Sequence, residues 1–147
     1  MLARDEVQRI FESAFPEATS LPIIEEVTDS GVIVRYPIDS RHERPGGTVS
    51  GPTMMMLADT AAYAAILSRI GSVLLAVTTS LHIDFLRRPA MTDLLAEGTI
   101  LKLGRQLAVV EVAIRSDGSS EMVAKAQATY SPPPLLEVSG APRNLGQ

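Results

Sequence analysis

Apolar residues recur at every third or fourth position near the start of the chain. This spacing predicts an amphipathic helix over Arg4–Phe15, which Pro16 ends. The apolar positions of this helix are Val7, Ile10, Phe11 and Ala14. Two β-rich runs follow, Ile23–Thr28 and Val32–Ile38. The turn residues between them, 29–31, predict a β-hairpin.

A second helix is predicted from Pro52 to Ile70, and its pattern is different. It is apolar nearly all round, whereas an amphipathic helix keeps one polar face. Proline suits the first turn of a helix, and Gly71 is typical of a helix end. A polar loop rich in charge, proline and glycine, Asp39–Gly51, leads into it. Because such a helix cannot face water, the rest of the chain must wrap around it.

The remainder of the chain has the pattern of β-strands, with turn residues at 104–105 and 117–118. Alternation along residues 109–115 predicts one wet face and one buried face. The predicted strands are Val73–Leu86, Asp93–Leu103, Gln106–Arg115 and Met122–Ser131. The order is therefore α+β. One antiparallel sheet curled around the central helix is the simplest architecture for it.

Length and composition narrow the class of protein. A chain of 147 residues is one domain of ordinary size, which we expect over residues 1–134, with a loosely ordered tail at 135–147 after three prolines. The net charge of −4 argues against nucleic acid as the main partner. The absence of cysteine excludes disulfides, thiolate metal sites and a cysteine nucleophile. Neither a signal peptide nor an apolar run of bilayer length is evident, so we expect a cytoplasmic protein that does not enter membranes.

Asp59 is the only charged residue in the predicted central helix before Arg69. Burying an unpaired carboxylate costs free energy or raises its pKa, so a chain keeps one most readily where it has a chemical role. The glycine-rich stretch Pro45–Pro52 precedes this helix. Free backbone N–H groups at a helix start form a site for negative charge. A carboxylate base and an anion-binding turn on one helix indicate hydrolysis of an acyl group.

Three segments together resemble the hotdog fold, and more narrowly the PaaI-like (phenylacetic-acid-degradation-type) acyl-CoA thioesterases. Gly47–Pro52 stands where that family has a Gly-x-x-His-Gly-Gly turn, and Leu57–Ala61 matches its Leu-Ala-Asp-x-Ala at the family's spacing. Ala76–Ala90 matches its long strand, which ends in a Pro-Ala turn. The resemblance covers roughly Pro37 to Ser131. It implies an antiparallel sheet around a long helix and hydrolysis of an acyl-CoA to a free acid and coenzyme A, with no metal or redox cofactor.

The resemblance also implies roles for individual residues. Asp59 takes the catalytic acid position, as general base on water or as nucleophile. Gly51 takes the place of the glycine whose N–H polarises the thioester carbonyl. Thr78 falls where a water-positioning hydroxyl can occur. The alternative for Asp59 is a carboxylate satisfied by threonine or backbone donors across a dimer seam.

The sequence departs from the family pattern at three positions. The family's histidine is Ser50, its second glycine is Pro52, and the asparagine that commonly precedes the motif is Arg44. Proline lacks an N–H, but Gly51 keeps its own, so an oxyanion donor remains. Ser50 can still cap the helix.

Several further residues are candidates for contacting the substrate. Arginines suit bidentate contact with the phosphates of coenzyme A, and Lys102 could join them; a solvated rim is the alternative. The three consecutive methionines could line an acyl tunnel or belong to the core. The glycines could clamp the thioester or belong to an ordinary loop. The candidates are Arg44, Gly47, Ser50, Met55, Thr60, Arg87, Arg88 and Arg105.

The two histidines do not indicate a catalytic triad or a structural metal site. His82 shares a strand face with Ser80 and Asp84, and neighbours on one face stand side by side and do not converge. Two histidines without cysteine are too few ligands for a structural zinc site. His42, in the loop before the central helix, could reach the site from outside, but we expect it to lie at the solvated surface.

The expected active site depends on the expected oligomer. One sheet cannot cover both sides of so apolar a helix, so we expect a homodimer or homotetramer with the active site at the seam. The competing hypothesis is a non-catalytic acyl-CoA or fatty-acyl binding protein on the same fold, which Ser50 and Arg44 favour. A dehydratase of this fold would need a helix-borne His or Glu, and neither is present. The sequence does not specify the acyl chain.

Overall fold

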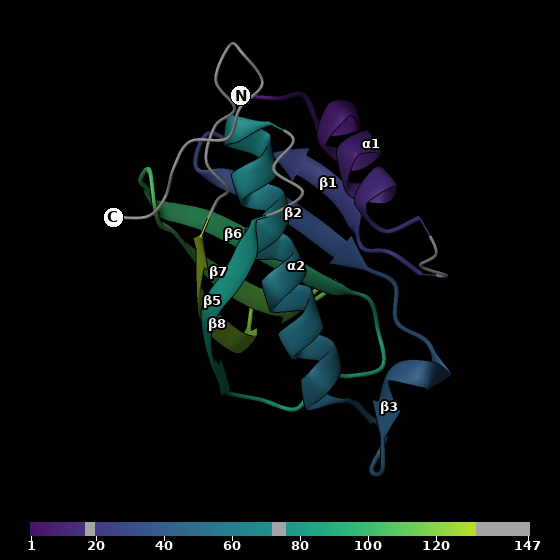
Figure 1. Ribbon diagram of the computed structural model, residues 1–147. Helices are drawn as coiled ribbons and strands as arrows, with labels where there is room; N and C mark the ends of the chain where they lie inside the picture. The colour runs from purple at the N-terminus through teal and green to yellow at the C-terminus, as the bar shows by residue number, and fades with distance from the viewer. Residues whose placement is uncertain (17–19, 72–75, 132–147) are drawn as a thin grey trace.

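The computed structural model describes residues 1–16, 20–71 and 76–131. A six-stranded antiparallel sheet curls around helix α2 (Gly51–Ile70), with strands in the order β1-β2-β6-β7-β8-β5 (Figure 1). The strands are β1 (Ile23–Val27), β2 (Gly31–Tyr36), β5 (Val77–Phe85), β6 (Leu94–Leu103), β7 (Ala108–Ser116) and β8 (Met122–Ser131). This is the α+β hotdog architecture that the sequence predicts, and the prediction is confirmed.

Helix α2 is buried because it has almost no polar face. Every residue from Ala61 to Ser68 is inaccessible to solvent or nearly so. Gly98 of β6 lets the helix backbone come close, since a Cβ there would lie 3.2 Å from the carbonyl oxygen of Ala61. On β7 the buried and partly exposed residues alternate as predicted.

Helix α1 (Arg4–Ala14) covers the β1 edge of the sheet (Figure 1). The Gln8 side chain accepts a hydrogen bond from Ile24 N–H at 2.7 Å, and Val7 and Phe11 are buried. The opposite edge of the sheet is β5, whose side chains are largely exposed: Val77 is 58% and Phe85 49% exposed. Helix α1 thus covers one edge of the sheet, whereas the side chains of the other edge strand, β5, are largely exposed.

The loop before α2 has more structure than the sequence predicts. Ser40–His42 forms a 3₁₀ turn, and β3 (Glu43–Arg44) pairs with β4 (Thr48–Val49) in a small hairpin. Gly46 and Gly47 form its tip at φ of 106° and 76°, a backbone region that favours glycine.

Two predictions fall partly or wholly outside the described residues. The strand predicted from Val73 begins at Val77, and positions 72–75 are among the undescribed ones. The tail predicted at 135–147 lies entirely outside them. Within the part of the chain that is described, neither helix combines the length and hydropathy needed to cross a membrane.

Candidate active site

Asp59 lies half-buried on α2, facing the β5–β8 pair. Its Oδ1 accepts hydrogen bonds from Thr78 Oγ1 at 2.7 Å and from the Tyr130 hydroxyl at 2.6 Å. Thr78 and Tyr130 stand directly opposite each other on β5 and β8, so the register of that pair brings both donors to one oxygen. No donor from residues 1–16, 20–71 or 76–131 reaches Oδ2. The carboxylate is therefore held through Oδ1, and Oδ2 is left without a donor from these residues.

Tyr130 is a site residue that the sequence analysis missed. Burial, and then the hydrogen bond to Asp59, raise the pKa of Tyr130 well above its usual range. The phenol therefore stays protonated and remains a donor to the carboxylate. Its hydroxyl also lies 3.0 Å from the Asp59 carbonyl oxygen. The signal that could have found it is its position opposite Thr78, which follows only from the strand register.

A cavity of about 400 Å³ opens beside Asp59. Its walls come from the end of α1, from α2 and from β8, including Phe15, Thr60, Tyr63 and Tyr130. The Phe15 and Tyr63 rings meet edge-on with centroids 6.3 Å apart, and Tyr63 stacks on Tyr130 at 6.0 Å. The carboxylate thus stands at the wall of an aromatic cavity.

A second cavity, of about 350 Å³, lies at the start of α2. Gly51 borders it, and so do three of the predicted substrate-binding residues, Arg44, Arg87 and Arg88. Arg87 donates to the Met122 carbonyl oxygen at 2.8 Å. Within the described ranges the structure records no ion pair for Arg44 or Arg88, and no acceptor for the Gly51 N–H. A residue with a free backbone donor at a helix start therefore borders a basic cavity.

The two cavities belong to different stretches of the same helix. Gly51 and Asp59 are eight residues apart, which is about 12 Å along an α-helix. A single carbonyl group cannot lie within hydrogen-bond reach of Gly51 N–H and also next to the Asp59 carboxylate of the same chain. One chain therefore holds two half-sites.

A family profile, described as thioesterase superfamily, matches residues 46–123. This match covers more than half of the chain, including Gly51 and Asp59. The chain belongs to the thioesterase superfamily. The enzyme class predicted from the sequence, a thioester hydrolase, is confirmed with it.

Solved structures support this membership. The thioesterase is 38% identical to a candidate thioesterase from Silicibacter sp. TM1040, over 91% of this chain and 94% of the other, with a TM-score of 0.82. Thioesterase superfamily member 2 from zebrafish is 20% identical, over 89% and 99% of the two chains, with a TM-score of 0.76. A thioesterase from Haemophilus influenzae is 19% identical, over 94% and 95%, also with a TM-score of 0.76. The last two likenesses concern the fold alone. No curated protein matches the sequence.

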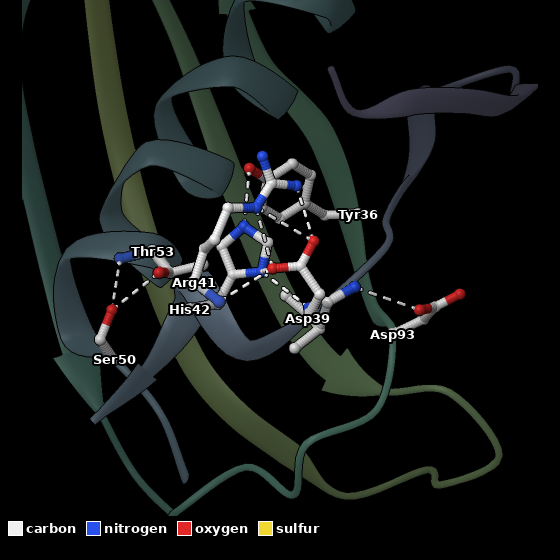
Figure 2. Close-up of polar contacts among 8 residues, drawn as sticks. Tyr36, Asp39, Arg41, His42, Ser50, Thr53 and Asp93 are labelled. Atoms are coloured by element: carbon white, nitrogen blue, oxygen red, sulfur yellow. Dashed lines mark hydrogen bonds and ion pairs between the residues drawn. The ribbon is translucent and has the colours of Figure 1, made fainter. Parts of the chain in front are cut away.

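The thioesterase uses Ser50 as a helix cap. Its Oγ accepts a hydrogen bond from Thr53 N–H at 3.3 Å and lies 2.7 Å from Thr53 Oγ1 (Figure 2). This is the capping that the sequence analysis allowed.

Other predicted binding residues are not brought to either half-site. Gly47 is at the tip of the β3–β4 hairpin, and Met55 is 43% exposed on α2, whereas Met54 borders the basic cavity. Lys102 and Arg105 border another cavity, at the β6–β7 turn. That turn is at the end of the sheet where Tyr130 pairs with Thr78, while Arg87 and Arg88 follow Phe85 at the other end. The four basic residues therefore do not form one patch.

The histidines differ from each other in their surroundings. His82 lies exposed beside Asp84, with 3.1 Å between Nε2 and Oδ2. The expectation that His42 is solvated is wrong: only 8% of it is exposed, because it packs edge-on against Tyr36. Among the described residues, no cluster of histidine and acidic side chains has the arrangement of a metal site.

Proposed function

We propose that this thioesterase hydrolyses acyl-coenzyme A thioesters to a free acid and coenzyme A. The observation that carries the proposal is the setting of Asp59. Oδ1 is held by two hydroxyl donors, Oδ2 is left for a reactant, and the residue borders an aromatic cavity. A carboxylate fixed in one orientation beside a substrate-sized cavity has the geometry required of a general base.

In the proposed reaction, Asp59 Oδ2 takes a proton from water while the water oxygen attacks the thioester carbonyl carbon. Negative charge then develops on the carbonyl oxygen, and the Gly51 N–H donates to it. Collapse of the intermediate breaks the C–S bond, and the proton held by Asp59 passes to the leaving thiolate. If Asp59 instead attacks directly, an acyl–aspartyl anhydride forms and water cleaves it in a second step.

A second copy of the chain completes the site in this proposal. Because about 12 Å along α2 separates the two residues, Asp59 of one subunit would work with Gly51 of another. Among the described residues β5 is an edge strand of the sheet, and Met55 and Met56 expose 43% and 37% of their surface on the adjoining helix. Such an edge is normally covered in the working protein. Sedimentation should show a dimer or tetramer, and a stable monomer at micromolar concentration would contradict this step.

The basic cavity would receive the phosphates of coenzyme A. The protein carries a net charge of −4, so binding a polyanion requires local positive charge. Arg44, Arg87 and Arg88 supply it next to Gly51. The acyl group would then lie against Asp59, in the aromatic cavity of about 400 Å³, which suits aryl and short or medium acyl groups.

Release of free coenzyme A from a panel of aryl, short-chain and medium-chain acyl-CoAs, followed with a thiol reagent, tests the function. We expect turnover with at least one of them. Absence of release across the whole panel, with bound acyl-CoA detected by calorimetry, would overturn it.

That second outcome describes the alternative function, a non-catalytic acyl-CoA binding protein. The observation that favours it is the use of Ser50 as a helix cap, because its hydroxyl is engaged with Thr53 and does not reach toward a thioester. Arg44 likewise stands where the PaaI-like pattern has asparagine. Binding without thiol release would establish this alternative.

A further inference from the structure

His42 is buried, yet the proposed reaction does not use it. Its ring makes two hydrogen bonds (Figure 2): Nδ1 accepts from Asp39 N–H at 2.9 Å, and Nε2 lies 3.1 Å from the Tyr36 hydroxyl. Because a backbone N–H can only donate, Nδ1 must be unprotonated. The proton of the neutral ring is then on Nε2, which donates to the Tyr36 oxygen. Both ring nitrogens are engaged, so the ring has one orientation.

The backbone of His42 reaches the start of α2. Its carbonyl oxygen accepts a hydrogen bond from Ser50 N–H at 2.8 Å. On the other side of the same segment, Val49 N–H donates to the Pro89 carbonyl oxygen at 3.3 Å. Ser50 also caps the helix through Thr53 (Figure 2). Ser50, which precedes Gly51, is therefore held by His42 and by Thr53, and the residue before it is held by Pro89.

The contacts from Tyr36 through His42 to Ser50 connect the sheet with the start of α2. Tyr36 is the last residue of β2 and is only 5% exposed, so it is a fixed support. The ring of His42 is fixed to that support, and its carbonyl fixes Ser50. The direction of the Gly51 N–H depends on the conformation of Ser50, because the two share a peptide unit.

We propose that His42 is a positioning residue that aims the Gly51 N–H at the oxyanion, with Tyr36 as its support. The inference rests on the proposed function, since it needs Gly51 as the donor. A misdirected donor weakens the transition state more than the ground state, so the effect belongs in kcat. His42 itself touches no substrate.

Three variants dissect the contacts. His42→Leu removes both ring hydrogen bonds, His42→Asn retains an acceptor for Asp39 N–H, and Tyr36→Phe removes only the hydroxyl. We expect kcat to fall on the order of 10-fold in His42→Leu with little change in KM, since small misplacements of catalytic groups are costly. His42→Asn should recover part of the loss. Arg41→Ala is the control from the same turn, because its exposed guanidinium pairs with the Asp39 carboxylate.

A second readout does not depend on activity. Amide hydrogen exchange at Ser50 should accelerate in His42→Leu and stay slow in Arg41→Ala. Thermal unfolding of each variant reports the fold, and if His42→Leu does not fold, the Asn and Phe variants carry the test. Unchanged kcat and unchanged Ser50 exchange in the folded variants would overturn the inference. If the parent shows no turnover with any acyl-CoA, the proposed function fails, and the exchange data alone decide whether His42 holds Ser50.

Discussion

The start and the middle of α2 offer opposite chemistry. At its start, Gly51, whose N–H has no acceptor among the described residues, borders a cavity that three arginines also line. Two turns later, a carboxylate held by two hydroxyls faces a cavity bordered by aromatic rings. The start suits negative charge, and the middle suits a proton acceptor beside an apolar group. In the proposed mechanism, one helix carries both halves of the hydrolytic site, but they lie too far apart to act on one carbonyl within a single chain.

Of the predicted effects, the largest should come from removing the carboxylate in the middle of α2. Asp59→Asn keeps the shape and removes the base, so kcat should fall by at least about 10²-fold while the fold is unchanged. Steady-state kinetics measure kcat, and circular dichroism reports the fold. Asp29→Asn, in the exposed β1–β2 turn, is the matched control. Unchanged turnover in the Asp59 variant would remove Asp59 from the mechanism.

Weakening the support of that carboxylate should cost less. Tyr130→Phe leaves Thr78 as the remaining hydroxyl donor to Oδ1, so we expect kcat to fall on the order of 10-fold. Stability should decline by about 1 kcal/mol for the lost hydrogen bond. Kinetics with urea unfolding separate the two effects. A variant that loses stability but retains full kcat would reduce Tyr130 to a structural role.

Enlarging the aromatic cavity should change which substrate is preferred. Phe15 borders it from α1 and is 43% exposed, so Phe15→Ala removes a wall at little cost to the fold. We expect kcat/KM to shift toward longer acyl chains by about 10-fold, the value of a methylene or two in an apolar pocket. Leu107→Ala, equally exposed at 44% but on the β6–β7 turn, is the control. An unchanged chain-length profile would place the acyl group elsewhere.

The smallest effect is expected from the basic residues at the start of the helix. Arg87→Ala with Arg88→Ala should raise KM for an acyl-CoA several-fold with little change in kcat, because phosphate contacts bind ground and transition states alike. KM should also rise with salt, since exposed contacts are screened over about 8 Å at physiological ionic strength.

The opposite end of the sheet supplies the control for the arginine pair. Lys102→Ala with Arg105→Ala should leave KM unchanged. A short thioester without the nucleotide should be handled equally by the parent and by both double variants. Equal effects of the two double variants would mean that neither pair is specific for coenzyme A.

Local pattern was sufficient to predict most of the fold. The apolar run of α2 and the alternation of apolar residues along β7 predict burial directly, because each pattern lies within one helix or strand. The motif around Gly51 and Asp59 likewise lies on one continuous stretch. These features are readable since they do not depend on where distant segments meet.

What the sequence could not supply depends on tertiary contacts. Tyr130 meets Asp59 only because α2 packs against β8, and the β5–β8 register places it opposite Thr78. Phe15 reaches the cavity only because α1 packs against the helix–sheet core. The burial of His42 follows from Tyr36, at the end of another strand. The sequence grouped Arg87 and Arg88 with Lys102 and Arg105 as candidate phosphate contacts, but the two pairs lie at opposite ends of the sheet.

Mixing two inactive variants tests the two-subunit site most directly. Asp59→Asn lacks the base. Gly51→Pro lacks the N–H donor, and proline is compatible with the extended Ser50 before it, at φ −70° and ψ 152°. In a mixed dimer, one site has both lesions and the other has none. After subunit exchange, we expect recovery to about a quarter of the parent activity, since half of the dimers are mixed and each has one intact site. Activity no higher than that of the separate variants, with mixed dimers demonstrated by mass spectrometry, would show that Asp59 and Gly51 do not act across the interface.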